Sequence, residues 1–131
     1  MSSKAKILLV DDVAAILEEE ERVVKSLSPD ITVLKVGTGQ DAIKAIVAQR
    51  PDVVFLDLIL PDLHGDAVCK WVKSKPELAD VNIVIVTARN DDAQLQRSFQ
   101  SGCDAYVTKP IDAEDIKTKV NMLLSEKGIY L

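Results

Sequence analysis

Five short runs of mostly aliphatic residues alternate along the chain with segments of helical periodicity. The strands expected from these runs are Lys6–Val10, Thr32–Val36, Val53–Asp57, Val81–Thr87 and Ala105–Thr108. Their nearly continuous Val, Ile and Leu content is typical of strands covered on both faces, as in a parallel sheet. The intervening segments are long enough to form helices, so the pattern indicates five consecutive βα units.

Turn and capping residues fall between the expected elements. Pro51 follows the second helical segment, where proline cannot continue the helical hydrogen bonding. Thr38 and Asp41 have the spacing of a capping box, and Asp112 fits the start of the fifth helix. Gly102 fits a left-handed residue after the fourth helix.

Strand–helix–strand connections of this length are parallel and right-handed, which predicts a three-layer α/β sandwich. The pattern alone does not determine the strand order uniquely. We favour a flavodoxin-like (βα)5 fold with order 2-1-3-4-5, because it creates a switch point between the first and third strands. Asp11 and Asp12 would then face Asp57 across that point.

The chain has the length and composition of one folded domain. It contains 131 residues, of which 47% are hydrophobic and 28% are charged, without a low-complexity linker or an internal repeat. We expect a single domain over residues 1–131, with its core at about 5–125 and a short C-terminal tail. The net charge of -5 disfavours non-specific binding to nucleic acid.

Neither cysteine spacing nor hydropathy indicates a redox, secreted or membrane protein. Cys69 and Cys103 form no C-x-x-C motif, and we expect both to be buried thiols of a reducing compartment. No apolar stretch is long enough for a signal-peptide core or a membrane span. A cytoplasmic location is expected.

Polar side chains stand where the apolar runs end. Asp11 and Asp12 follow the first strand, Asp57 ends the third, Thr87 ends the fourth and Lys109 follows the fifth. The carboxyl ends of parallel strands form one rim, and ligands bind there. Carboxylates at such a rim suit Mg²⁺, and the hydroxyl and ammonium suit phosphoryl oxygens. Asp57 lies within an apolar stretch, where a carboxylate without a chemical role would be costly.

The segments ILLVDD, VVFLDLILPDLHG, IVIVTA and AYVTKPI occur in the order and at the spacing of a known family. Over about residues 5–125 the chain resembles the receiver domains of two-component response regulators. This resemblance implies that Asp57 is the phosphoacceptor and a metal ligand. It also implies that Asp12 binds Mg²⁺ directly, that Asp11 helps to position the ion and that the Ile59 backbone carbonyl completes the protein ligands.

The same resemblance implies a conformational switch. Thr87 and Lys109 would contact the phosphoryl oxygens, and Tyr106 would rotate when Thr87 moves. The bond before Pro110 corresponds to a common cis peptide of the family. Phosphorylation would then change the surface formed by the fourth helix, fifth strand and fifth helix.

The donor implied by the resemblance is a histidine kinase or a histidine phosphotransfer protein. The phosphorylated domain would act on a partner protein or on an output domain. The sequence fits both a stand-alone receiver and the front part of a longer regulator. The domain is expected to catalyse its own phosphorylation and dephosphorylation without being a conventional enzyme. No direct contact with nucleic acid or membrane is expected.

Three other functions remain as alternatives. A receiver-like interaction module would keep the fold without phosphotransfer. An aspartate-nucleophile phosphatase of the dehalogenase-like class favours a D-x-D motif, whereas this chain has Asp11-Asp12-Val13. A flavodoxin-like cofactor binder needs a phosphate-binding loop after the first strand, where these aspartates would repel phosphate.

Other residues are expected to be structural. Glu18–Glu21 should form a solvated helix face, Trp71 should pack in the core and His64 should be a turn residue. Leu95 and Phe99 should form a thin apolar stripe on the fourth helix, Asp91–Ser101. Ile59 and Arg89 are expected to flank the path of a hydrolytic water.

Overall fold

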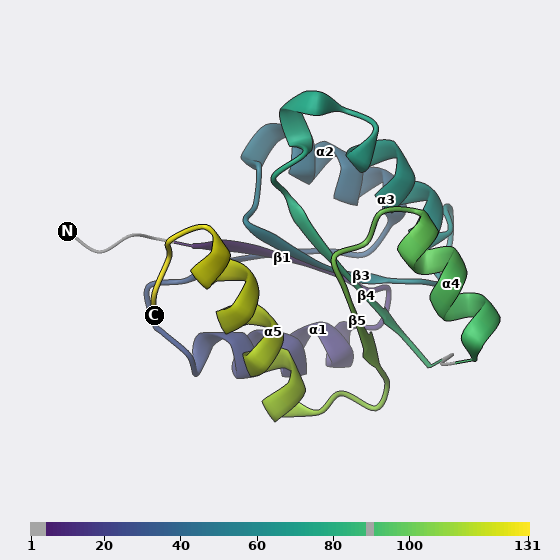
Figure 1. Cartoon of the computed structure of the whole chain (residues 1–131). Coiled ribbons are helices and arrows are strands. Elements are labelled where there is room, and N and C mark those ends of the chain that lie inside the picture. Colours follow the sequence, from purple (N-terminus) through teal and green to yellow (C-terminus); the bar gives the residue numbers. More distant parts are fainter. Residues whose placement is uncertain (1–4, 89–90) are drawn as a thin grey trace.

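A five-stranded parallel sheet with helices on both faces forms the centre of the computed structural model, which describes residues 5–88 and 91–131 (Figure 1). The strands are β1 (Lys6–Val10), β2 (Thr32–Val36), β3 (Val53–Asp57), β4 (Asn82–Thr87) and β5 (Ala105–Thr108). Four strands have the predicted bounds, and β4 begins one residue later than predicted. The predicted three-layer fold is confirmed.

The sheet order is β2-β1-β3-β4-β5, as predicted. All neighbouring strands pair in parallel, and Val10 lies opposite Leu56 while Asp57 lies opposite Val86. This register brings the ends of β1, β3 and β4 to one rim of the sheet. In Figure 1 that rim lies on the side away from the two chain termini.

The connecting helices are α1 (Ala14–Lys25), α2 (Gly39–Gln49), α3 (Gly65–Lys73), α4 (Asp92–Gln100) and α5 (Ala113–Glu126), with a 3₁₀ turn η1 (Pro76–Leu78). Thr38 caps α2 by accepting from the Asp41 N–H, and Asp112 caps α5 through the Glu114 N–H. Gly102 has a φ of 100° after α4, as the sequence predicted for a left-handed residue. Local capping therefore sets the predicted helix boundaries.

Alternate residues of the central strands build two cores. Leu8 and Val10 pack on the side of α2 and α3, whereas Ile7 and Leu9 pack on the side of α1 and α5. Side chains alternate between faces along a strand, so a strand that is apolar at every position buries both of its faces. The sheet is thereby fixed between two helical layers (Figure 1).

Trp71 is an exception to the predicted packing. Its side chain is exposed on the outer side of α3, and the Lys75 ammonium lies 5.0 Å from the centroid of its ring. The buried face of α3 is instead formed by Val68, Cys69 and Val72. The prediction that Trp71 packs in the core was wrong, because its amphipathic ring is covered by a lysine at the surface.

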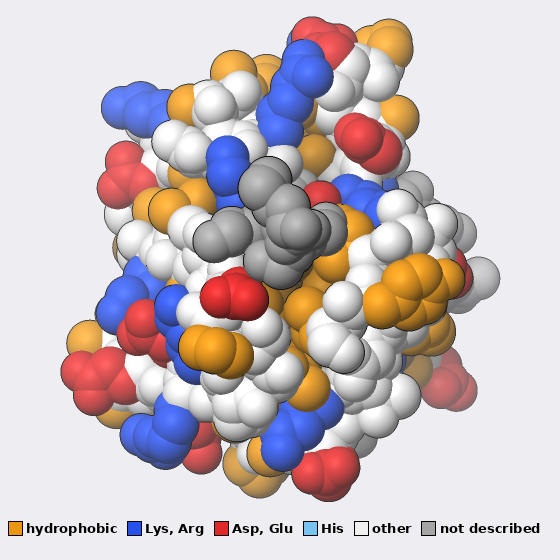
Figure 2. All heavy atoms as spheres, turned by 90° about the vertical axis from the view of Figure 1, so that its left-hand side faces the viewer, with side chains coloured by type: hydrophobic (Ala, Val, Ile, Leu, Met, Phe, Trp, Pro, Cys, Tyr) orange, Lys and Arg blue, Asp and Glu red, His pale blue; other side chains and the backbone are white. Residues whose placement is uncertain are grey.

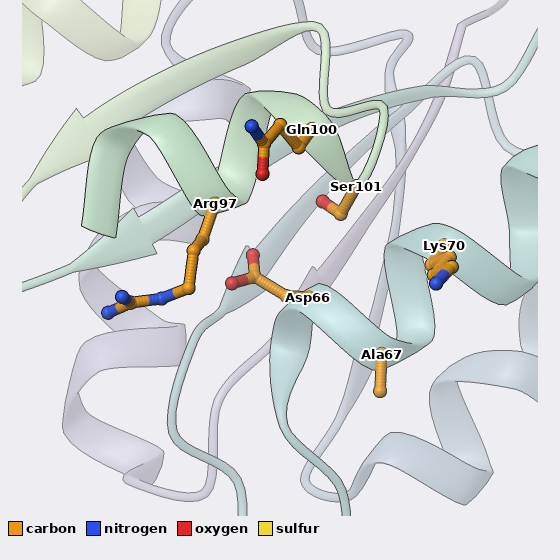
Figure 3. Close-up of a pocket in the computed structure, with 6 residues that line it drawn as sticks. All are labelled: Asp66, Ala67, Lys70, Arg97, Gln100 and Ser101. Atoms are coloured by element: carbon orange, nitrogen blue, oxygen red, sulfur yellow. The ribbon is translucent and has the colours of Figure 1, made fainter. Parts of the chain in front are cut away.

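The buried face of α4 is polar rather than apolar. Gln94 and Ser98 are buried, whereas Phe99 is 52% exposed, so the predicted stripe of Leu95 and Phe99 is not the buried face of this helix. Gln94 Nε2 donates to Asp66 Oδ2 of α3 at 3.0 Å. Figure 3 shows Asp66 pointing from α3 toward α4. Hydrogen bonds to α3 thus orient this helix.

Within residues 5–88 and 91–131, none of the helices combines the length and the apolar character that crossing a membrane requires.

Candidate functional site

Three carboxylates meet at the rim where β1 and β3 end. Asp11 and Asp57 are buried, with 1% and 6% exposure, while Asp12 is exposed. One carboxylate oxygen from each lies within 4.8 Å of the others. The predicted switch point between β1 and β3 therefore gathers the three predicted aspartates into one cluster.

Lys109 joins the cluster from the loop after β5. Its Nζ lies 3.1 Å from Asp11 Oδ2 and 3.4 Å from Asp57 Oδ1. The Lys109 backbone N–H donates to the Thr87 carbonyl at 2.8 Å, and the peptide bond from Lys109 to Pro110 is cis. The backbone contact holds the lysine beside the end of β4, and its side chain reaches the acidic cluster.

Burial and neighbouring charges change the protonation equilibria of this cluster. The pKa of Asp57 is raised, first by burial and then by the negative charge of Asp11, while Lys109 and the Ile59 N–H oppose the rise. Burial alone would lower the pKa of Lys109, but its ion pairs with Asp57 and Asp11 outweigh burial and raise it. The ammonium therefore stays charged and partly neutralises the carboxylates.

Glu20 is a fourth carboxyl near this cluster that the sequence analysis missed. Glu18–Glu21 was expected to be solvated, yet Glu20 on α1 is 2% exposed and its Oε1 has no hydrogen-bond partner among the described residues. Burial, followed by the charge of Asp11, raises its pKa to about 8. The sequence contains a pattern that predicts this burial, because Glu20 has the helical spacing of Leu17 and Val24 and so falls on the inward face of α1.

The loop between β3 and α3 carries Ile59, whose side chain is 59% exposed beside the cluster. The Ile59 N–H donates to Asp57 Oδ1 at 3.4 Å. Gly65 closes the loop by donating to the Leu58 carbonyl at 2.7 Å, and a Cβ at this position would lie 2.6 Å from the Asp57 carbonyl oxygen. Only glycine allows this close approach. His64 is an exposed turn residue, as predicted, and its Nδ1 accepts from the Asp66 N–H.

Thr87 and Tyr106 lie on the neighbouring strands. Thr87 is buried at the end of β4, one position beyond Val86, the partner of Asp57 in the register. Tyr106 on β5 is partly buried against the core of α2 and α3, and its ring centroid lies 6.4 Å from that of Phe99 on α4. Tyr106 therefore links the strand that leads to Lys109 with the exposed aromatic residue of α4. Arg89, the other residue expected beside the water path, lies outside the described residues.

The donor set fits a hard divalent cation. Asp11, Asp12 and Asp57 offer oxygen atoms only, and these are close enough together to share one ion. Mg²⁺ is held by few carboxylates and retains water or phosphate oxygens as its other ligands. An acidic rim with one lysine can thus bind a cation and a phosphoryl group next to the same aspartate.

Comparison with known sequences agrees with this geometry. The sequence profile of the response regulator receiver domain matches residues 7–121. The DNA-binding response regulator MtrA of Mycobacterium tuberculosis is 33% identical over 121 residues, and the match covers 92% of this chain and 51% of MtrA. The transcriptional regulatory protein AfsQ1 of Streptomyces coelicolor is 30% identical, with 83% of this chain and 49% of AfsQ1 covered. The chain spans about half the length of these curated relatives.

Solved structures of response regulators and receiver domains superpose on this chain. A two-component response regulator from Clostridium difficile superposes with a TM-score of 0.84 at 26% identity, covering 94% of this chain and 98% of that one. The signal receiver domain of a histidine kinase from Syntrophus aciditrophicus superposes with a TM-score of 0.84 at 27% identity, covering 93% and 91%. The chain belongs to the response regulator receiver domain family of two-component systems.

Proposed function

We propose that this receiver domain is a phosphorylation-dependent switch that accepts a phosphoryl group on Asp57. The donor is the phosphohistidine of a histidine kinase or of a histidine phosphotransfer protein. The observation that carries the proposal is the cluster of Asp11, Asp12 and Asp57 with Lys109 ion-paired to two of them. The family is not one of conventional enzymes, so the domain acts on its own side chain.

Asp57 is the nucleophile. One carboxylate oxygen attacks phosphorus as the bond from phosphorus to the histidine nitrogen breaks, and the leaving imidazole takes a proton from solvent. When held by Asp11, Asp12, Asp57 and the Ile59 backbone carbonyl, Mg²⁺ supplies positive charge beside the phosphoryl oxygens. Such transfer requires positioning and charge neutralisation more than acid–base chemistry. Burial, followed by the negative charge of Asp11, raises the pKa of Asp57, and a cation held beside these carboxylates would favour the ionised form.

Lys109 and Thr87 respond to the new charge. Phosphorylation converts one carboxylate into a group with close to two negative charges. The Lys109 ammonium, already 3.4 Å from Asp57 Oδ1, then donates to a phosphoryl oxygen. The Thr87 hydroxyl donates to another, which draws the end of β4 toward Asp57.

The switch follows from these new hydrogen bonds. Inverting a population from 1:99 to 99:1 requires about 5.5 kcal/mol of preference for the active state. A few charge-assisted hydrogen bonds provide energy of this order. Movement of Thr87 leaves space that the Tyr106 ring fills, and its neighbour Phe99 shifts with it. The result is a changed surface over α4, β5 and α5.

The downstream partner is proposed to be a protein or an output domain that reads this surface. MtrA, a relative, is a DNA-binding response regulator. For this domain itself we propose no direct contact with nucleic acid or membrane, because its net charge is -5. On the face that carries the two termini, positive and negative side chains are interspersed (Figure 2). The proposed location is the cytoplasm.

Transfer from a donor tests the proposal. A histidine phosphotransfer protein carrying labelled phosphohistidine is mixed with the wild-type chain in Mg²⁺ or in excess EDTA. We expect rapid, Mg²⁺-dependent label on the wild type, lost in hydroxylamine as an acyl phosphate is, and none on Asp57→Asn. Labelling of Asp57→Asn at the wild-type rate would contradict the proposal. Multiple turnover of a simple phosphomonoester would instead support the phosphatase alternative.

A further inference from the structure

The loop between β3 and α3 is fastened to a helix that is distant in sequence. Asp62 Oδ1 accepts from the Gly39 N–H at 2.8 Å, and Asp62 Oδ2 accepts from the Gln40 N–H at 2.9 Å. These donors are the first two residues of α2. The carboxylate of one loop therefore caps a helix that begins more than twenty residues earlier.

The contact lies at the partly exposed start of α2. The first N–H groups of a helix have no partner within the helix, and a negative charge there is favoured by the helix dipole. Thr38 satisfies the Asp41 N–H, so Asp62 and Thr38 together satisfy the first three N–H groups of α2. Hydrogen bonds from Gln40 and then Gly39 lower the pKa of Asp62, so its carboxylate is ionised at neutral pH.

Packing supports the same attachment. A Cβ at Gly39 would lie 2.8 Å from the Leu63 Cβ, so the start of α2 has no side chain where the loop approaches. Near the site the loop is closed by an antiparallel bridge between Ile59 and His64 and by the hydrogen bond from Gly65 to Leu58. Asp62 lies between these closing contacts and attaches the loop to α2.

We infer that Asp62 is a positioning residue that holds the Ile59 backbone carbonyl in place for Mg²⁺ by fastening its loop to α2. This inference rests on the proposed function, in which that carbonyl is a metal ligand. Asp62 itself does not touch the ion. Its effect passes through the backbone of residues 59–62. Outer residues that orient metal ligands commonly change metal affinity about 10-fold to 100-fold when removed.

The test compares Asp62→Ala and Asp62→Asn with Asp80→Ala, which removes the same charge from an exposed turn before β4. Mg²⁺ affinity is measured by calorimetric titration at fixed ionic strength. We expect Asp62→Ala to weaken binding about tenfold. Asp62→Asn should recover part of this loss, because its amide oxygen accepts one of the two N–H groups. Asp80→Ala should bind as the wild type does.

Amide hydrogen exchange without metal gives an independent readout. We expect faster exchange at Ile59 and Gly39 in Asp62→Ala than in Asp80→Ala, with unchanged protection of β1, β3 and β4. Equal Mg²⁺ affinity in Asp62→Ala and Asp80→Ala would overturn the inference. Absence of Mg²⁺ binding by the wild type would overturn the proposed function, and hydrogen exchange would then decide whether Asp62 fastens the loop.

Discussion

Lys109 Nζ donates to Asp11 Oδ2 at 3.1 Å, although 98 residues separate them in the sequence. Their strands, β5 and β1, are not neighbours, because β3 and β4 lie between them in the sheet. The lysine therefore reaches across the carboxyl ends of both intervening strands and also pairs with Asp57 on the way. One ammonium thus pairs with two of the three carboxylates of the acidic cluster.

Replacing Lys109 should separate cation binding from phosphoryl binding. In Lys109→Met we expect tighter Mg²⁺ binding, by roughly tenfold, because the ammonium no longer competes for the same carboxylates. Binding of beryllofluoride, a phosphoryl mimic, should weaken. Titrations of both ligands check this, with Lys117→Met, a half-buried lysine of α5 that is ion-paired with Glu114, as the control. Unchanged Mg²⁺ affinity would contradict the competition.

Glu20 should make stability depend on pH. Its pKa is about 8 in the folded protein and has a reference value of 4.5. The folded state therefore binds the proton more tightly, and stability is lost as pH rises from about 4.5 to about 8. In Glu20→Gln we expect this loss to be smaller by a few kcal/mol. Urea unfolding in EDTA measures the free energy of unfolding of both proteins at pH 5 and pH 8.5. An equal change between the two pH values in wild type and Glu20→Gln would refute the raised pKa of Glu20.

The hydrogen bonds between α3 and α4 should show strong coupling. Gln94 Nε2 donates to Asp66 Oδ2 and to Ser98 Oγ, and Gln94 Oε1 accepts from Arg97. Loss of Gln94 removes the donor to Asp66 Oδ2, and loss of Asp66 leaves Gln94 Nε2 with its bond to Ser98 alone among the described residues. In a double-mutant cycle of Asp66→Ala and Gln94→Ala we expect about 1 kcal/mol of coupling and faster amide exchange in α4. Additive effects would show that the pair is not energetically linked.

Ile59 should set the lifetime of the phosphorylated state. Its side chain is exposed two residues after Asp57, and we expect it to obstruct a water that approaches the acyl phosphate. We expect Ile59→Asn to hydrolyse faster, because a smaller polar side chain admits and orients water. Decay of labelled phosphoprotein in Mg²⁺ measures the rate, with Val47→Asn, at an exposed position of α2, as the control. Similar lifetimes in wild type and Ile59→Asn would refute this role.

The periodic pattern predicted the strands and the fold class because each strand is mostly aliphatic and is followed by a helix. The β4 boundary differed by one residue, since Val81 is apolar and buried but precedes the paired segment. The convergence of Asp11, Asp12, Asp57 and Lys109 followed from parallel topology, because all four lie at strand ends.

The predictions that were wrong concern polar side chains that are buried and apolar side chains that are exposed. Glu20 was assigned to solvent because it stands in a run of glutamates, although helical spacing places it inward. Gln94 is buried because hydrogen bonds satisfy its amide, and Phe99 is exposed beside Tyr106. For α4, long-range partners such as Asp66 decide which face is buried, and local patterns contain no information about such partners. The contact of Asp62 with α2 was missed for the same reason.

Intact mass after incubation with Mg²⁺ and acetyl phosphate decides whether Asp57 is the phosphoacceptor. We expect the wild type to gain the mass of one phosphoryl group, EDTA to abolish the gain and Asp57→Asn to show none. A gain of the same size in Asp57→Asn, or none in the wild type, would contradict this role of Asp57.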